Sequence, residues 1–199
     1  MREEVVAEIR RKSIHAIPGF MAIPVVVWLG NPYATAIACF FLVLYALNEA
    51  SLRLKLNWRI PIAWHTYRLM ARRDELERGY FTGTVYFWAV TTAVVWLMEP
   101  HLAAATVMVS SFGDAAAAIF GKALGGPRVP LSNKTLTGFA GMFLASMAST
   151  LICGVRVEAA LLASLLSAAV ELATPLSTLD ELTVPVTAAL SLQLLAGAR

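Results

Sequence analysis

The chain is poor in charged residues, since Asp, Glu, Lys and Arg together make up only 15% of its 199 residues. A soluble globular domain carries about a quarter charged residues. Hydrophobic residues make up 58% of the chain, and they occur in blocks long enough for a helix to cross a bilayer, which takes about 20 residues. The composition therefore excludes an ordinary soluble domain and predicts a polytopic membrane protein.

Other absences narrow the possibilities further. The only two cysteines, Cys39 and Cys153, lie inside apolar blocks, which excludes a disulfide framework or a Cys/His zinc site. No Gly/Ser-rich or Pro-rich linker divides residues 1–199, so we expect a single domain. The N-terminal stretch MREEVVAEIRRK has no cleavage site after a short apolar core, so it does not read as a signal peptide. GxxxxGK[ST], GxGxxG and HExxH are absent, which leaves a soluble-kinase P-loop and zinc chemistry without support.

The apolar blocks predict an all-α, polytopic membrane bundle of about seven transmembrane helices. The expected spans cover residues 14–30, 32–52, 80–98, 101–121, 136–154, 158–175 and 183–197. Residues 55–79 alternate apolar and basic side chains, a pattern that predicts an interfacial helix on the membrane surface. Of the 16 Lys and Arg residues, only Arg156 and Arg199 fall on the opposite side from the N-terminus. By the positive-inside rule, the N-terminus is then cytoplasmic.

The fourth expected span contains a carboxylate in the stretch GDAAAAIFGKALGG, residues 113–126. An aspartate in the middle of a membrane helix costs ~2.5–3.5 kcal/mol on insertion scales. At 100° per residue, Asp114 shares one stripe of the helix with Ala117, Gly121 and Gly125. The glycines also match the GxxxG pattern of closely packed membrane helices, but packing does not explain Asp114.

The loop that follows, GGPRVPLSNKTLTG, supplies Arg128, Lys134 and several hydroxyl residues. Lys134 is a point charge suited to phosphate, and backbone N–H groups at the start of the fifth span can bind anions. A carboxylate for a hard cation and a lysine for phosphates are what a magnesium–nucleotide site needs.

These residues carry a resemblance to a known family. Residues 114–125 fit D-x-x-A-x-x-x-G-x-x-x-G, and NKTLTG at 133–138 resembles a following K-K-T-x-E-G, with Asn133 in place of the first lysine and Thr137 in place of the acid. The pair is similar to the CTP-binding signature of the dolichol kinase and phytol kinase family, membrane enzymes that phosphorylate lipid alcohols with CTP. RKSIH at the first span, Asn48–Glu49, ERGYFTGTVYF and ELATPLSTLDELTVP resemble the family's other signatures in order along the chain.

The resemblance implies a CTP-dependent kinase for a polyprenol or other lipid alcohol, with its site at the cytoplasmic end of the bundle and no nucleic-acid partner. Phosphatidate cytidylyltransferases share the nucleotide signature, but their C-terminal H-G-G-x-x-D-R-x-D is absent here. A third reading is a cation-coupled transporter that uses Asp114, Glu171 and Glu49, although the chain lacks the internal repeat of such proteins.

The expected roles are as follows. Mg²⁺ or another divalent cation binds Asp114, with Glu171 or Asp180 as a second ligand. The cations expected to offset phosphate charge are Lys134, Arg11, Lys12 and Arg78. The remaining residues expected around the nucleotide are Gly113, Ala117, Gly121, Lys122, Gly125, Asn133, Thr135 and Gly138.

Three residues are candidates for the general base: Asp180, Glu49 and His15. Each has a structural alternative. Glu49 could form an internal salt bridge to Arg11, Lys12 or Arg78. Asp180 could be the N-cap of a final helix beginning near Glu181, and His15 could form an interfacial hydrogen bond.

Overall fold

Helices form most of the described chain, which comprises residues 2–56, 58–130 and 132–196 of a computed structural model. These residues form no β-strand, and an isolated antiparallel bridge joins Arg128 to Thr135. The all-α prediction is therefore confirmed.

The helices, in chain order, are α1 (Arg2–His15), α2 (Ile17–Ala22), the π-helix η1 (Ile23–Trp28), α3 (Asn31–Arg53), α4 (Pro61–Met70), α5 (Arg73–Arg78), α6 (Thr82–Leu97), α7 (Pro100–Met108), the π-helix η2 (Val109–Gly113), α8 (Asp114–Leu124), α9 (Leu136–Ile152), α10 (Val157–Ala173) and α11 (Ser177–Ala196). Each expected span overlaps one of these helices or an unbroken helical run. Two starts differ from the prediction by more than two residues: the first run begins at Arg2, and the last helix begins at Ser177.

Proline and glycine set several of these boundaries. Pro32, Pro61 and Pro100 lie in the first turn of α3, α4 and α7, where the missing N–H would have no helical partner in any case. Gly30 separates η1 from α3. Its φ of 91° is a backbone conformation that glycine adopts without steric cost.

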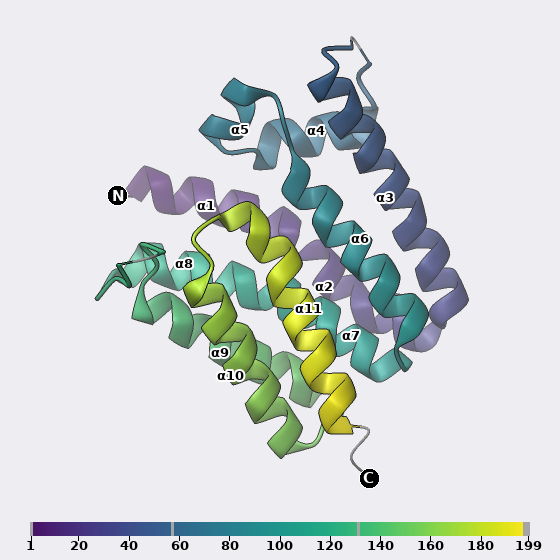
Figure 1. Cartoon of the computed structure of the whole chain (residues 1–199), viewed down its shortest axis with the longest axis vertical. Coiled ribbons are helices and arrows are strands. Elements are labelled where there is room, and N and C mark those ends of the chain that lie inside the picture. The colour runs from purple at the N-terminus through teal and green to yellow at the C-terminus, as the bar shows by residue number, and fades with distance from the viewer. Residues whose placement is uncertain (1, 57, 131, 197–199) are drawn as a thin grey trace.

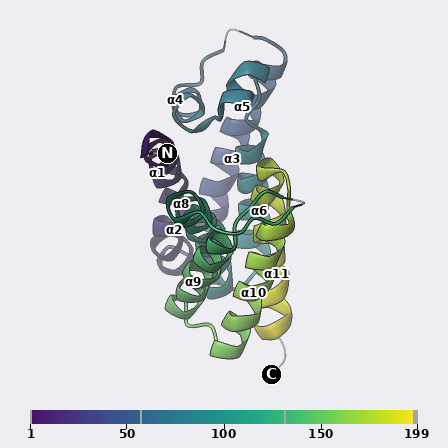
Figure 2. The ribbon, with the colours of Figure 1, turned by 90° about the vertical axis from the view of Figure 1, so that its left-hand side faces the viewer.

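The long helices run roughly side by side (Figure 1). Helix α6 packs between α3 and α11, α10 packs against α9 and α11, and α8 packs against α9 and α1. Helices α4 and α5 lie together at one end of the molecule in both views (Figure 2). This arrangement brings the end of α1, the start of α8 and the start of α11 toward one another.

Two helical segments are long and apolar enough to cross a membrane, Asn31–Arg53 and Pro100–Leu124. Helices α6 and α9 are apolar but shorter. Large hydrophobic side chains are exposed on the outer helix faces, including Phe40 and Val43 of α3 and Leu162 and Leu166 of α10.

The segment expected to hold one interfacial helix forms two short helices, α4 and α5. Ala63 and Tyr67 of α4 are buried against Tyr45 of α3 and against Phe81. The aromatic rings of Tyr67 and Phe81 meet edge to face at 5.4 Å between centroids. The contact fixes α4 over the ends of α3 and α6.

Candidate active site

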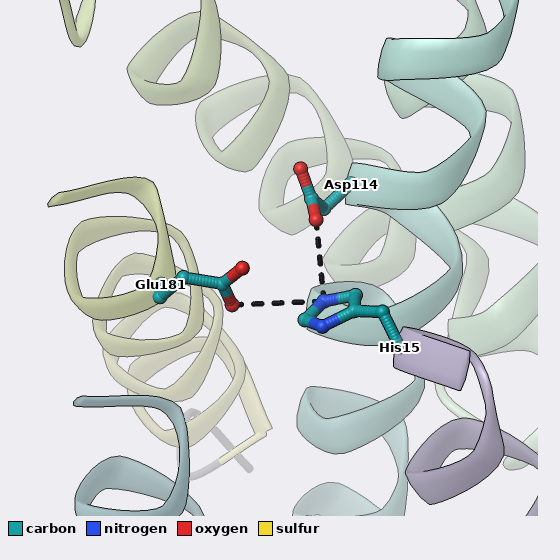
Figure 3. Close-up of side chains that lie close together, drawn as sticks. All are labelled: His15, Asp114 and Glu181. Carbon is teal, nitrogen blue, oxygen red and sulfur yellow. Dashed lines mark ion pairs between the residues drawn. The ribbon is translucent and has the colours of Figure 1, made fainter. Parts of the chain in front are cut away.

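Three side chains from distant parts of the sequence converge in the interior: His15 at the end of α1, Asp114 at the start of α8 and Glu181 in α11 (Figure 3). One potential ligand atom of each lies within 4.8 Å of the others. His15 Nε2 is 3.2 Å from Asp114 Oδ2 and 3.6 Å from Glu181 Oε2. Two carboxylates and an imidazole nitrogen are groups that bind a divalent cation or exchange a proton.

The helix geometry around Asp114 is irregular. The π-helix η2 ends at Gly113, directly before Asp114, and single π-turns inside α-helices occur frequently at functional sites. A Cβ on Gly113 would lie only 2.6 Å from Met142 Sδ of α9, so a larger residue there would push α9 away. A Cβ on Gly19 would similarly meet Phe112 and Ser111 at 2.9 Å. The small residues therefore let α2 and α9 close around the turn that carries Asp114.

Basic residues of α1 surround the carboxylate. Lys12 is buried, with 2% of its surface exposed, and its Nζ forms an ion pair with Asp114 Oδ2. Arg11 pairs with Glu8, and Lys122 of α8 contacts the same glutamate at 2.5 Å. Burial alone would raise the pKa of Glu8. The positive charges of Arg11 and Lys122 outweigh this effect and lower the pKa to about 2. Arg11 and Lys12 therefore lie close to Asp114, in the site for which the sequence predicted them.

An apolar cavity of about 450 Å³ opens from this cluster. Its walls come mainly from the first helical run, α3, α4 and α6, with side chains such as Met21, Val25, Ala38 and Phe41. The polar groups that line it include Arg11, His15, Arg72, Glu75 and Glu181. Single small-molecule sites occupy about 300–1,000 Å³ and are mostly apolar with a few placed polar groups, so the cavity suits one amphiphilic molecule.

Lys134 lies in a second ionic cluster. Its Nζ is 2.6 Å from Asp180 Oδ2, 2.9 Å from Glu171 Oε1 and 2.6 Å from the backbone oxygen of Glu171. Three acceptors match the three N–H donors of an ammonium group. In this conformation Lys134 therefore joins the NKTLTG loop to α10 and α11, and its donors are directed to protein oxygens.

Two glycines of the signature region, Gly121 and Gly138, serve helix packing in this structure. A Cβ on Gly121 would lie 2.9 Å from Thr135 Oγ1, and one on Gly138 would lie 2.9 Å from the backbone oxygen of Ala117. Thr135 Oγ1 accepts a hydrogen bond from Gly138 N at 3.1 Å and caps α9. The close contact between α8 and α9 therefore depends on Gly121 and Gly138. Of the two glycines in the GxxxG alternative, Gly121 packs against α9, whereas a Cβ on Gly125 would meet nothing within 4 Å and this residue ends α8 with a φ of 65°.

Both departures from the signature have a local physical reason. Asn133 has a φ of 58°, a left-handed conformation that Asn adopts more readily than Lys. The hydroxyl of Thr137 donates to the backbone oxygen of Gly125, the C-cap of α8, and lies 3.0 Å from Thr135 Oγ1. An ionised acid at position 137 could not donate the bond to Gly125.

Glu49 and Arg78 lie away from the cluster of His15, Asp114 and Glu181. Glu49 accepts from Phe81 N at 2.5 Å and Thr82 Oγ1 at 2.6 Å, and it pairs with Arg53 at 2.6 Å. It anchors the start of α6, and its salt-bridge partner is Arg53 of its own helix rather than any of the three predicted cations. Arg78 is an exposed residue at the end of α5.

The predicted metal ligands are divided between the two clusters. Asp114 lies with His15 and Glu181, whereas Glu171 and Asp180 both contact Lys134. The prediction that Asp180 caps the last helix is wrong, because α11 begins at Ser177 and Asp180 lies in its first turn. Glu181 was missed because the start of this helix was predicted too late along the chain. In a helix that begins at residue 177, the side chains of Asp180 and Glu181 point about 100° apart, so one reaches each cluster.

Comparisons of the chain with protein-family models, with curated proteins and with solved structures found no match. The resemblance to the lipid-alcohol kinases therefore remains a prediction from the motifs.

Proposed function

We propose that this chain is a multi-pass membrane kinase that transfers the γ-phosphoryl group of CTP to the hydroxyl of a lipid alcohol. The observation that carries the proposal is that His15 and Glu181 line an apolar cavity of about 450 Å³, with Asp114 directly behind them in the same cluster. An enzyme for a water-insoluble alcohol needs a space for the tail and ionisable groups at the hydroxyl, and this site offers both.

The exposed surface supports a membrane location. Two helical segments are long and apolar enough to cross a membrane, and large hydrophobic side chains are exposed on the outer faces of α3 and α10. Soluble proteins rarely expose large contiguous apolar patches. We propose that the seven expected spans, from residues 14–30 to residues 183–197, cross the bilayer, with the charged start of α1 in the cytoplasm as the Lys/Arg bias predicts.

The nucleotide would bind on the Asp114 side of the cluster. Arg11, Lys12 and Lys122 gather positive charge there, and phosphoryl transfer depends mostly on positioning and charge compensation. Asp114 would hold Mg²⁺, which prefers carboxylate oxygens and would supply charge compensation at the phosphates. The choice of CTP comes from the resemblance.

In this proposal Lys134 positions the loop between α8 and α9. Its contacts to Glu171 and Asp180 fix the loop relative to α10 and α11. At the end of α8, the hydroxyl of Thr137 donates a hydrogen bond to the backbone oxygen of Gly125. A direct contact between Lys134 and phosphate would require it to give up one of these acceptors.

The experiment that tests the proposal uses purified protein in vesicles containing one lipid alcohol at a time: geranylgeraniol, phytol, dolichol or diacylglycerol. CTP carries the label at either the γ- or the α-phosphate, and Mg²⁺ is present. The proposal predicts that label reaches the lipid from the γ-position only. Transfer from the α-position with release of pyrophosphate would identify a cytidylyltransferase. A protein that neither transfers label nor shows a thermal shift with Mg²⁺ and CTP would fit the transporter reading instead.

A further inference from the structure

We infer that His15 is the catalytic residue that accepts the proton of the lipid hydroxyl, and that Glu181 positions this hydroxyl. The inference deepens the proposed kinase function and rests on it.

The contacts of the other two candidate bases exclude them. Both oxygens of Glu49 are engaged by Phe81, Thr82 and Arg53 at the start of α6, and Glu49 does not line the cavity. Asp180 also lies outside the cavity wall and pairs with Lys134 at 2.6 Å. Neither carboxylate is placed to meet a group that enters the cavity.

His15, unlike Glu49 and Asp180, lies in the wall of the cavity. The residue has 7% of its surface exposed. Its Nε2 has no hydrogen-bond partner among the described residues. A buried polar nitrogen without a partner costs free energy, and a hydroxyl entering the cavity would satisfy it. Asp114 Oδ2 is near Nε2, at 3.2 Å, but outside hydrogen-bonding geometry.

The ring is held in a fixed orientation. Phe87 of α6, which also lines the cavity, contacts the ring edge to face at 5.2 Å between centroids. The aromatic contact holds the imidazole plane against α6, with Nε2 toward Asp114 and Glu181.

Glu181 lies on the cavity side of the ring. It lines the cavity with His15, and its Oε2 is 3.6 Å from Nε2 (Figure 3), so one hydroxyl lying beside both atoms can hydrogen-bond to each. Asp114 is outside the cavity wall. The cluster therefore divides into a lipid side, His15 and Glu181, and a nucleotide side, Asp114 and Lys12.

The O–H bond of the lipid alcohol breaks and its proton moves to His15 Nε2. The alcohol oxygen forms a bond to the γ-phosphorus of CTP while the bond from that phosphorus to the bridging β-phosphate oxygen breaks, and CDP leaves. Asp114 and Glu181 face the imidazolium and stabilise its charge, while Lys12 and Arg11 lie on the same helix and oppose it.

The test measures γ-label transfer from CTP to the most active of the four alcohols by the wild type and by His15→Ala and His15→Gln. A positioned general base contributes about 10²–10⁴-fold. We therefore expect kcat to fall at least about 100-fold, with an unchanged KM for CTP. Added imidazole should partly restore kcat in His15→Ala and should no longer do so in His15→Ala/Glu181→Gln. His101→Ala, at an exposed histidine near the start of α7, is the matched control and should keep wild-type kcat.

The outcomes separate the two proposals. A wild type that transfers no γ-label overturns the kinase function and this inference with it. A wild type that transfers label, with either folded His15 variant within about twofold of its kcat, overturns the inference alone. A loss of kcat in folded His15→Ala that imidazole does not restore would assign the ring a packing role and also overturn it.

Discussion

Lys12 and Asp114 are 102 residues apart in sequence and form a buried ion pair between α1 and α8. Lys12 has 2% of its side chain exposed and Asp114 has 14%. The pair gives the aspartate a charged partner inside an apolar bundle, and it holds the N-terminal helix against the helix that carries the signature.

Removal of Lys12 should destabilise the protein strongly. Breaking a buried pair by removing one partner costs about 3–5 kcal/mol, because the other charge is left uncompensated. We therefore expect Lys12→Met to lower the unfolding temperature clearly, and Lys12→Met/Asp114→Leu to recover most of the loss. The control is Arg73→Ala, which breaks an exposed pair with Glu77 and should change little. An unchanged unfolding temperature in Lys12→Met would contradict this account of the pair.

Glu8 should make stability depend on pH in the acid range. Its pKa is lowered from 4.5 to about 2 in the folded protein, so the folded state binds this proton less readily than the unfolded state. The stabilisation is therefore complete above about pH 4.5 and is lost as the pH falls toward 2. We expect the stability difference between wild type and Glu8→Gln, measured by denaturant unfolding, to shrink across that window. A difference that stays constant from pH 6 to pH 2.5 would be the contrary result.

Lys134→Met should weaken the packing of α11 and α10 against the NKTLTG loop. The substitution leaves Glu171 and Asp180 buried without the cation that joins them. We expect a lower unfolding temperature, with partial recovery in Lys134→Met/Asp180→Asn because one of the two acids then carries no charge. If Lys134→Met were as stable as wild type but bound CTP much more weakly, Lys134 would be a phosphate ligand rather than a structural cross-link.

A bulky residue in the cavity should block the lipid without affecting the nucleotide. Ala38 is buried on α3 and lines the cavity, whereas Ala36 of the same helix is exposed and does not. We expect Ala38→Trp to lose most transfer to lipid while the thermal shift with Mg²⁺ and CTP is retained, and Ala36→Trp to behave as wild type. Full lipid transfer by folded Ala38→Trp would show that the tail binds elsewhere.

The helices were predictable because their signal is local. The spans expected at 32–52 and 136–154 are helices at 31–53 and 136–152. A long apolar block next to Pro or Gly forms few structures other than a helix, so its position can be predicted from the sequence. The polar start of α1 was not included in the first span, because charged residues lower its hydropathy although they continue the same helix. The start of α11 was placed six residues late, at 183, since acids and hydroxyls at 177–181 look like a loop in a hydropathy pattern.

The site was only partly predictable. Asp114, Lys12 and His15 stood out as polar groups in or beside apolar spans, and the structure brings them together. Their partners depend on which helix faces which, and nothing in the sequence alone decides whether Lys134 meets Asp114 or Asp180. Glu181 is adjacent to a more conspicuous acid, and only the helix phase of α11 distinguishes the two.

Turnover by Asp114→Asn, assayed with γ-labelled CTP, Mg²⁺ and lipid alcohol, tests the central claim most directly. The control is Glu99→Gln, at an exposed acid that precedes α7. The account predicts that folded Asp114→Asn transfers no label while Glu99→Gln transfers it at the wild-type rate. Normal turnover by Asp114→Asn would contradict the assignment of this carboxylate to the reaction.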